Sequence, residues 1–441
     1  MRRVFVLGIC ATLTALAGCG GGGGGGGLAA PVAGTDACSN DAQKQFVLDQ
    51  MRDVYFWNDL IPASVDLTQY ATPEDVLAFL TSLQPLDSFS FITTVAADNA
   101  LFGSGEFGGF GFSYRFENDR ARFSRVFSAS PAALAGFERG HEIIAIEGQT
   151  VASLGPAGLA DAFGPSEVGV TRTFRNRRLD GSEYEVAVTK DTVTIDPIPQ
   201  YRLIPAAGGD VGYLEFSSFV STAESELSAA FADFSAANIT DLVLDLRYNG
   251  GGLVSIADLL GDYLGSAVAP SEVFSRTLFN ANNSASNSTE LFESRANSPS
   301  LARLVVIASG STASASELVI NSMEPHVEVV IVGADTFGKP VGQVAIDFCD
   351  RRLRPTAFET VNSLGQGQYF DGLPVDCPAP DDLDQPVGGS ADPALVTALE
   401  YLQNGACPPP TPVSAPPVDR LRERPIEPLR QDLAYRELGA V

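Results

Sequence analysis

One serine lies where a nucleophile is expected. Ser314 follows the apolar residues 304–308 and a short Gly- and Ser-rich turn, and a stretch with helical character begins directly after it. The first N–H groups of a helix have no intrahelical acceptor, and the helix dipole favours negative charge there. A serine at this point could attack a carbonyl group while those N–H groups stabilise the oxyanion. Serine is also a preferred helix cap, so a purely structural role fits the same position.

Lysine is scarce in this chain and therefore informative. Only Lys44, Lys190 and Lys339 occur among the 28 basic residues. Lys339 comes shortly after the apolar residues 329–332. An amino group emerging from apolar surroundings loses hydration, which lowers its pKa and lets it act as a base toward serine. The alternative is a lysine with a buried stem and a solvated head.

Histidine supply favours the same pair. A Ser-His-Asp site needs a histidine beside the nucleophile, and the chain contains only His141 and His326. His141 lies in a β-rich region far upstream. His326 lies near the far end of the helix that Ser314 is expected to begin. A serine–lysine pair is the serine chemistry that remains.

Three motifs carry a resemblance to a known family. Residues 312–317 read Thr-Ala-Ser-Ala-Ser-Glu, residues 336–339 read Thr-Phe-Gly-Lys, and residues 245–252 read Asp-Leu-Arg-Tyr-Asn-Gly-Gly-Gly. In this order they resemble the carboxyl-terminal processing peptidases of family S41, and the resemblance covers roughly residues 40–402. It implies a ClpP/crotonase-like α/β catalytic core with an inserted PDZ-like β-rich domain and a small N-terminal helical domain. It also implies a serine peptidase that acts on polypeptides near their C-termini and needs no metal or organic cofactor.

The resemblance assigns roles to individual residues. Ser314 would be the nucleophile and Lys339 the base. The third residue is either Gln343, which would orient the lysine, or Glu317. The remaining assignments are the oxyanion donors, which would be the N–H groups of Ala315 and of Gly251 or Gly252.

Two positions depart from the family pattern. Pro340 stands where the family has a second glycine, which puts the placement of Lys339 in question because proline lacks a donor and stiffens the chain. Gly250 replaces a common proline, which is a milder change.

The segments around these motifs predict three regions. Residues 39–102 are expected to form a helical domain, with a helix start at Thr72-Pro73-Glu74-Asp75. Residues 103–198 resemble a PDZ domain, whose glycine loop would hold a peptide carboxylate while the peptide adds a strand to the sheet edge. A small barrel without a ligand is the alternative for this region. The predicted cradle consists of Gly109, Phe110, Gly111 and Phe112.

Residues 199–407 predict the α/β core. Near-continuous apolar strands at residues 211–216 and 241–247 alternate with helices, as in sheets covered on both faces. The polar residues 280–288 are expected to form an exposed loop. Residues 408–441 are rich in proline and charge and are expected to be a disordered tail.

The N-terminus reads as an export signal. Arg2 and Arg3 precede a short apolar run, and residues 16–19 read Leu-Ala-Gly-Cys, which resembles a bacterial lipobox with Cys19 lipidated. An ordinary signal peptide over residues 1–18 is the alternative. Residues 19–38 contain a glycine run and would be a flexible tether. The expected location is therefore the bacterial envelope, facing the periplasm, and Gly20 after the cysteine weakly favours the outer membrane.

Charge and cysteine content set further limits. A formal net charge of -26 argues against a nucleic-acid partner. An exported chain favours two disulfides, and sequence order alone suggests Cys349 with Cys377 and Cys38 with Cys407. Free thiols are the alternative, and the spacing does not suggest a metal site. The rival to an enzyme is a noncatalytic scaffold or ligand-binding lipoprotein on the same fold, and the oligomeric state stays open.

Overall fold

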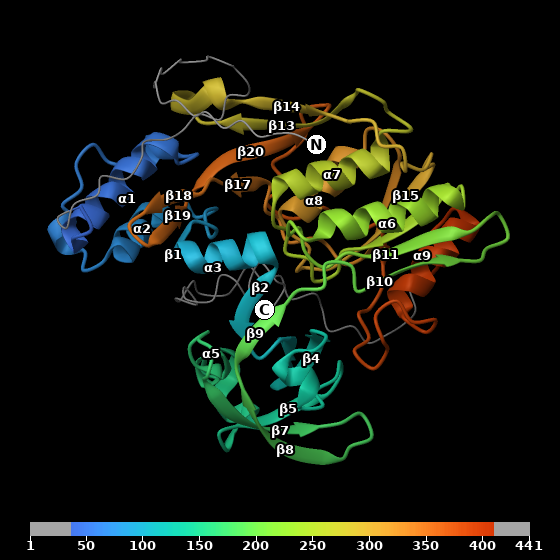
Figure 1. Ribbon diagram of the computed structural model, residues 1–441, viewed down its shortest axis with the longest axis horizontal. Helices are drawn as coiled ribbons and strands as arrows, with labels where there is room; N and C mark the ends of the chain where they lie inside the picture. Colours follow the sequence, from blue (N-terminus) through green and yellow to red (C-terminus); the bar gives the residue numbers. More distant parts are fainter. Residues whose placement is uncertain (1–36, 410–441) are drawn as a thin grey trace, which may run out of the picture.

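The computed structural model describes residues 37–409, and residues 1–36 and 410–441 lie outside the described part. The predictions for the export signal, Cys19 and the C-terminal tail fall on those outer residues and stay predictions. Figure 1 shows three regions: a helical region in blue, a large α/β core, and a β-rich insertion below the core.

A six-stranded sheet forms the centre of the core, in the order β10-β11-β12-β15-β16-β21. β10 is antiparallel to β11, and each later pair of neighbours is parallel. The two apolar strands predicted from the sequence are β11 and β12, which are adjacent. The strands are β10 (Gln200–Ile204), β11 (Val211–Glu215), β12 (Asp241–Asp245), β15 (Arg303–Ala308), β16 (Glu328–Gly333) and β21 (Cys377–Pro378).

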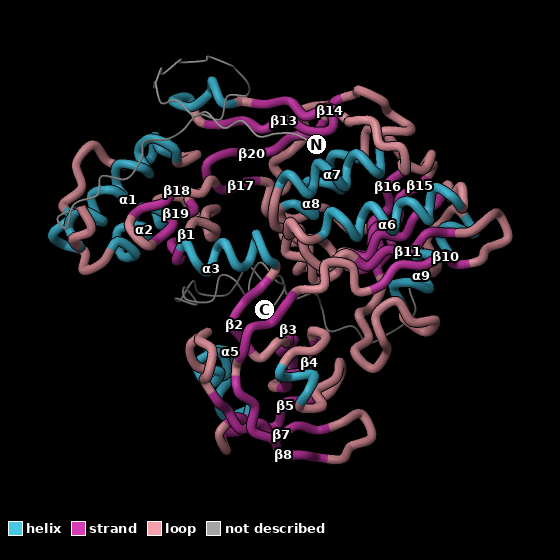
Figure 2. The backbone as a smooth tube through the Cα atoms, viewed as in Figure 1, coloured by secondary structure: helices cyan, strands magenta, loops and turns pink. Residues whose placement is uncertain are grey.

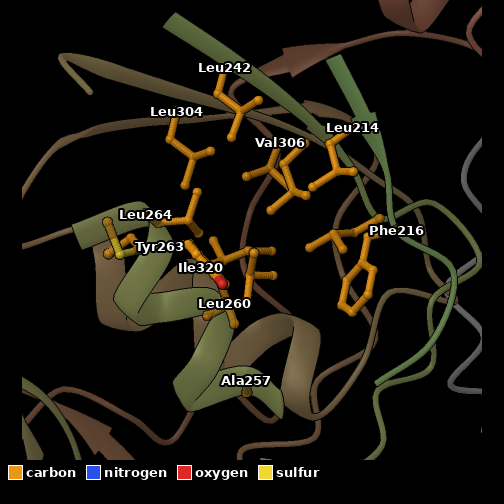
Figure 3. Packing of buried hydrophobic residues seen from close by; sticks show 14 of the residues in the cluster. Leu214, Phe216, Leu242, Ala257, Leu260, Tyr263, Leu264, Leu304, Val306 and Ile320 are labelled. Atoms are coloured by element: carbon orange, nitrogen blue, oxygen red, sulfur yellow. The ribbon is translucent and has the colours of Figure 1, made fainter. Parts of the chain in front are cut away.

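Helices cover both faces of this sheet (Figure 2), which confirms the predicted α/β core. In Figure 3, Leu242, Leu304 and Val306 from the strands face Leu260 and Ile320 from the helices. Burying one such side chain contributes about 1.5–3 kcal/mol. This packing therefore holds the ends of β12, β15 and β16 in place, and the three sequence motifs begin at or shortly after these ends. One face carries α6 (Ala223–Ala236), α7 (Val254–Gly265) and α8 (Ala315–Met323), and the other carries α9 (Pro393–Asn404).

A second sheet, in the order β14-β13-β20-β17, reaches from the core toward the helical region. The segment 280–288, predicted as a loop, forms the 3-10 helix η4 and the start of β14 instead. Nδ2 of Asn280 and of Asn283 donates to the Asp53 carbonyl, at 2.8 and 2.9 Å, so this insert caps the end of α1. The elements are β13 (Val273–Phe279), η4 (Ala281–Ser286), β14 (Ser288–Leu291), β17 (Val341–Gln343) and β20 (Thr356–Asn362).

The helical region begins as the sequence indicates. The predicted helix start is confirmed, because α2 begins directly after Thr72, and Thr72 and Asp75 form a reciprocal capping box there. A three-stranded sheet in the order β1-β19-β18 completes the region with strands from the later part of the chain. Its elements are α1 (Asn40–Val54), η1 (Asn58–Leu60), η2 (Leu67–Gln69), α2 (Pro73–Ser82), β1 (Phe91–Thr94), α3 (Val95–Asn99), η3 (Ala100–Ser104), β18 (Ile346–Phe348) and β19 (Arg351–Arg354).

The insertion is joined to the rest of the chain by the antiparallel pair of β2 and β9 (Figure 1). Its own sheet has the order β3-β4-β5-β7-β8, with β6 paired to β5, so β3 lies at an edge. Within residues 37–409, no helix is long and apolar enough to cross a membrane. The elements are β2 (Glu106–Gly109), β3 (Phe112–Glu117), β4 (Arg120–Val126), α4 (Pro131–Leu134), β5 (Glu142–Ile146), β6 (Gln149–Thr150), α5 (Val151–Phe163), β7 (Thr171–Arg177), β8 (Glu183–Thr189) and β9 (Asp191–Thr194).

Two disulfides are present, but the pairing expected from sequence order is wrong. Cys38 is bonded to Cys349, and Cys377 to Cys407. Cys38 precedes α1, which packs on the β18–β19 hairpin whose turn contains Cys349. Cys377 lies in β21, and Cys407 follows α9, which covers the same face of the sheet. Tertiary packing, which sequence order does not reveal, decides both pairs.

Mass spectrometry of the unreduced, digested protein should yield peptides that link Cys38 to Cys349 and Cys377 to Cys407. Replacing Cys377 and Cys407 together by alanine should lower the free energy of unfolding by about 3–4 kcal/mol, because the crosslink spans 30 residues of the unfolded chain. Peptides that link Cys349 to Cys377 would contradict the structure.

Candidate active site

Ser314 occupies a strained turn between β15 and α8. It is the N-cap of α8, and its φ of 57° lies in the left-handed region, which is unfavourable for a residue with a side chain. Such a conformation costs about 1–3 kcal/mol and persists only where the surroundings enforce it. Ser314 is partly exposed, whereas its neighbours Ala313 and Ala315 are buried. Ser314 is therefore accessible although the residues on either side of it are buried.

The loop after β12 supports this turn from the side. The Asn249 carbonyl accepts hydrogen bonds from the Ala313 N–H at 3.1 Å and the Ser316 hydroxyl at 3.0 Å. Gly251 has a φ of 105°, and a Cβ at this position would lie 2.8 Å from Ser314 Cβ. The close approach of this loop to Ser314 thus requires glycine at position 251.

The predicted oxyanion donors lie at this contact. Ala315 begins α8, so its N–H has no acceptor within the helix. The Gly251 N–H already donates to Asn249 Oδ1 at 2.9 Å. This internal bond favours Gly252 over Gly251 as the second donor.

Glu317 connects the turn of Ser314 to the turn of Lys339. Its carboxylate is fully buried, and its Oε2 accepts the N–H groups of Ser314 and Lys339 at 2.9 and 2.8 Å. Its Oε1 accepts the Thr336 hydroxyl at 2.5 Å and the Gly338 N–H at 2.7 Å. Burial raises the pKa of Glu317, while these four donated bonds act in the opposite direction and favour the ionised form. One carboxylate thus holds both predicted catalytic residues by their backbones.

The Lys339 amino group has a different partner. Its Nζ donates to Gln343 Oε1 at 3.1 Å, and the residue is only 7% exposed. Gln343 Nε2 in turn donates to the Phe89 carbonyl at 2.7 Å. Of the two candidates for the third residue, Gln343 therefore contacts the amino group, and Glu317 contacts the backbone.

Pro340 fits this arrangement. Its carbonyl accepts the N–H of Thr360 on β20 at 3.1 Å, directly before β17 begins. This bond fixes Pro340 to β20, directly before the strand that contains Gln343. The departure from the family pattern does not prevent an ordered Lys339 turn.

Arg247 anchors the other site loop in the core. It is buried and donates to Asp245 at 2.8 Å and to Asp392 at 2.6 Å. Tyr213 donates a further hydrogen bond to Asp245 at 2.9 Å. Asp392 was not predicted as a partner of Arg247, because an aspartate before a proline signals only a helix cap.

The two histidines have other partners. His326 Nε2 lies 3.0 Å from the Val273 carbonyl, and His141 Nδ1 lies 3.3 Å from the Tyr184 hydroxyl in the insertion. Among residues 37–409, no group of histidine, cysteine and acidic side chains is arranged to hold a metal ion. The chemistry that this arrangement offers is that of a serine with a nearby lysine.

Replacing Glu317 by glutamine should lower activity at least 100-fold and the free energy of unfolding by about 2–4 kcal/mol. The amide NH₂ would face two of the four donors and leave them without an acceptor. Glu324→Gln, one residue beyond α8, is the matched control and should change little. Assays of both variants beside urea denaturation test this, and an unchanged Glu317→Gln protein would refute the bridging role.

Comparison with known proteins agrees with this geometry. Residues 210–370 match the model of Peptidase family S41, and residues 42–91 match the Peptidase S41 N-terminal domain. A carboxy-terminal-processing protease of Bartonella bacilliformis is 29% identical over 292 residues, which are 63% of this chain and 64% of that protein. A chloroplastic C-terminal processing peptidase of Tetradesmus obliquus is 28% identical over 50% of this chain and 48% of that protein. The chain thus spans about half to two thirds of the length of these curated relatives.

Solved structures share the fold. A protein from Bacteroides fragilis assigned to the S41 proteases superposes with a TM-score of 0.63 at 24% identity, covering 81% of this chain and 97% of that chain. The photosystem II D1 C-terminal processing protease has a TM-score of 0.51 at 20% identity, covering 77% of this chain and 92% of that chain. Segments of this chain in the helical region and in the core thus match domain models of peptidase family S41, and the described residues share the fold of these solved structures.

Proposed function

We propose that this chain is a serine endopeptidase of the carboxyl-terminal processing type, with Ser314 as nucleophile, Lys339 as base and Gln343 orienting the lysine. The observation that carries the proposal is the Glu317 carboxylate, which binds the backbone N–H groups of both Ser314 and Lys339. A protein that only bound ligands would not need to hold an accessible serine and a buried lysine to one another in this way.

The proposed reaction follows from these groups. The neutral Lys339 amine takes the Ser314 hydroxyl proton as Oγ attacks the scissile carbonyl. The N–H groups of Ala315 and Gly252 stabilise the oxyanion. Lys339 returns the proton to the departing amine, which leaves an acyl ester on Ser314. A water molecule, deprotonated by Lys339, then attacks the ester, and Lys339 returns the proton to Ser314 Oγ as the free carboxyl product leaves.

The insertion is proposed to be a PDZ-like domain that engages the substrate. The carbonyls of Phe110 and Gly111 accept hydrogen bonds from Ala132 and Phe127, at 2.9 Å each. The Phe110 and Phe112 rings are buried in the core of the insertion. Backbone N–H groups in residues 109–112 and the edge strand β3 are therefore the groups proposed to hold a peptide.

Contacts of charged side chains join the insertion to the loop after β12, which contains Tyr248 and Asn249. Arg139 donates to Asp381 at 2.5 Å and to the Tyr248 hydroxyl at 2.7 Å, and Tyr248 directly precedes Asn249. Arg247 lies 3.5 Å from the same Asp381. A substrate held by the insertion would thus be delivered beside the loop that contacts Ser314.

The location is proposed to be the bacterial envelope, with a lipid anchor at Cys19 and a weak preference for the outer membrane. The two disulfides support an oxidising compartment. The proposed substrates are extended or unfolded polypeptides cut near their C-termini.

Ser314→Ala and Lys339→Ala should each lower cleavage of unfolded casein or a C-terminally tagged protein by about four orders of magnitude, because each removes one half of the reacting pair. Ser311→Ala, in the same turn, is the matched control and should stay within a few fold of the unaltered protein. Full cleavage by both active-site variants would end the catalytic assignment. Binding without cleavage by the unaltered chain would favour the scaffold instead.

A further inference from the structure

Phe89, from the helical region, contacts the predicted catalytic lysine in two ways. Its ring centroid lies 5.3 Å from Lys339 Nζ, close enough for a cation–π interaction. Its carbonyl accepts the hydrogen bond from Gln343 Nε2. Because the NH₂ of Gln343 is engaged there, the amide turns its oxygen toward Lys339.

A buried aspartate fixes the position of Phe89. Asp87 Oδ1 accepts the N–H groups of Phe89 and Ser90, both at 3.0 Å, and the Thr356 hydroxyl, also at 3.0 Å. Asp87 Oδ2 accepts the Ser90 hydroxyl at 2.6 Å. Thr356 begins β20, the neighbour of the strand that carries Gln343. The turn at residues 87–90 is thus tied to the same sheet as Gln343.

We infer that Phe89 and Asp87 are positioning residues for the base, so that the active site is completed by the helical region. Asp87 holds Phe89, the Phe89 carbonyl sets the Gln343 amide, and the amide oxygen and the Phe89 ring together place the Lys339 amino group. This inference rests on the proposed peptidase function. The inference extends that function by assigning part of the site to Phe89 and Asp87, which lie about 250 positions before Gln343 in the chain.

The two residues act by separable routes. Phe89→Leu keeps an apolar side chain but removes the aromatic face that favours the charged amine, so the pKa of Lys339 should fall by about half a unit to one unit. Asp87→Ala releases the whole turn, including the carbonyl, and should lower kcat about 10- to 100-fold with little change in KM. The Glu317 carboxylate at the Lys339 backbone is left intact in both variants.

The first experiment measures kcat and KM against pH for a short peptide, using the full chain. Phe89→Leu should move the acid limb of the kcat profile to lower pH. Phe89→Tyr keeps an aromatic ring and should leave the acid limb at its pH in the unaltered chain. Asp87→Ala combined with Gln343→Ala should be no worse than Gln343→Ala alone, because both act on one group. Fully additive losses, or an unmoved acid limb in Phe89→Leu, would overturn the inference.

Asp98→Ala is the matched control. Asp98 is also a buried aspartate of the helical region, and it accepts hydrogen bonds from Arg352 and Arg354 at 2.5 and 2.8 Å on β19. Its loss should destabilise the protein without changing the acid limb. If Asp98→Ala reproduced the kinetic changes of Asp87→Ala, those changes would result from a general loss of stability in the helical region. The inference would then fail.

A second readout does not depend on activity. The chain has only Lys44, Lys190 and Lys339, so ¹³Cε-lysine labelling gives three lysine signals, and Lys339→Met identifies the third. The Lys339 signal should titrate at a lower pH in Phe89→Leu than in the unaltered chain, also in a Ser314→Ala background. An inactive unaltered chain that shows this shift would refute the proposed function alone. An active chain without the shift would refute the positioning role alone.

Discussion

The buried carboxylate of Glu317 is the interaction on which the rest of the site depends. It gathers four hydrogen bonds from the turns of Ser314 and Lys339, which belong to different strand ends of the core. A buried carboxylate requires such donors, since burial without them would cost several kcal/mol. The same bonds therefore satisfy the charge and fix the two backbones to one another.

The surrounding architecture supports this bridge from three sides. The parallel sheet and its helices bring the ends of β15 and β16 together, and Asn249 holds the neighbouring glycine loop against Ser314. The helical region contacts Gln343 and Lys339 through Phe89. Two disulfides and the Asn280 and Asn283 side chains fasten the outer segments to this frame.

Local sequence patterns predicted much of the fold and part of the site. The features that could not be predicted depend on contacts between distant segments. The apolar strands, the helix start at Thr72 and the place of Ser314 at the beginning of a helix could be predicted because each depends on neighbouring residues. The bridging role of Glu317, the choice of Gln343 and the contact with Phe89 depend on packing between distant segments. The disulfide pairing was wrong for the same reason, and the insert at residues 280–288 was mistaken for a loop because its asparagines bond to the end of α1.

A crystal structure of the full chain with a peptide boronic acid tests the central claim most directly. We expect a covalent bond from boron to Ser314 Oγ, with Lys339 Nζ within hydrogen-bonding distance of that oxygen. One boronate oxygen should lie about 3 Å from the N–H groups of Ala315 and Gly252. An inhibitor bonded to another residue, or bound with Lys339 turned away from Ser314, would contradict the assignment.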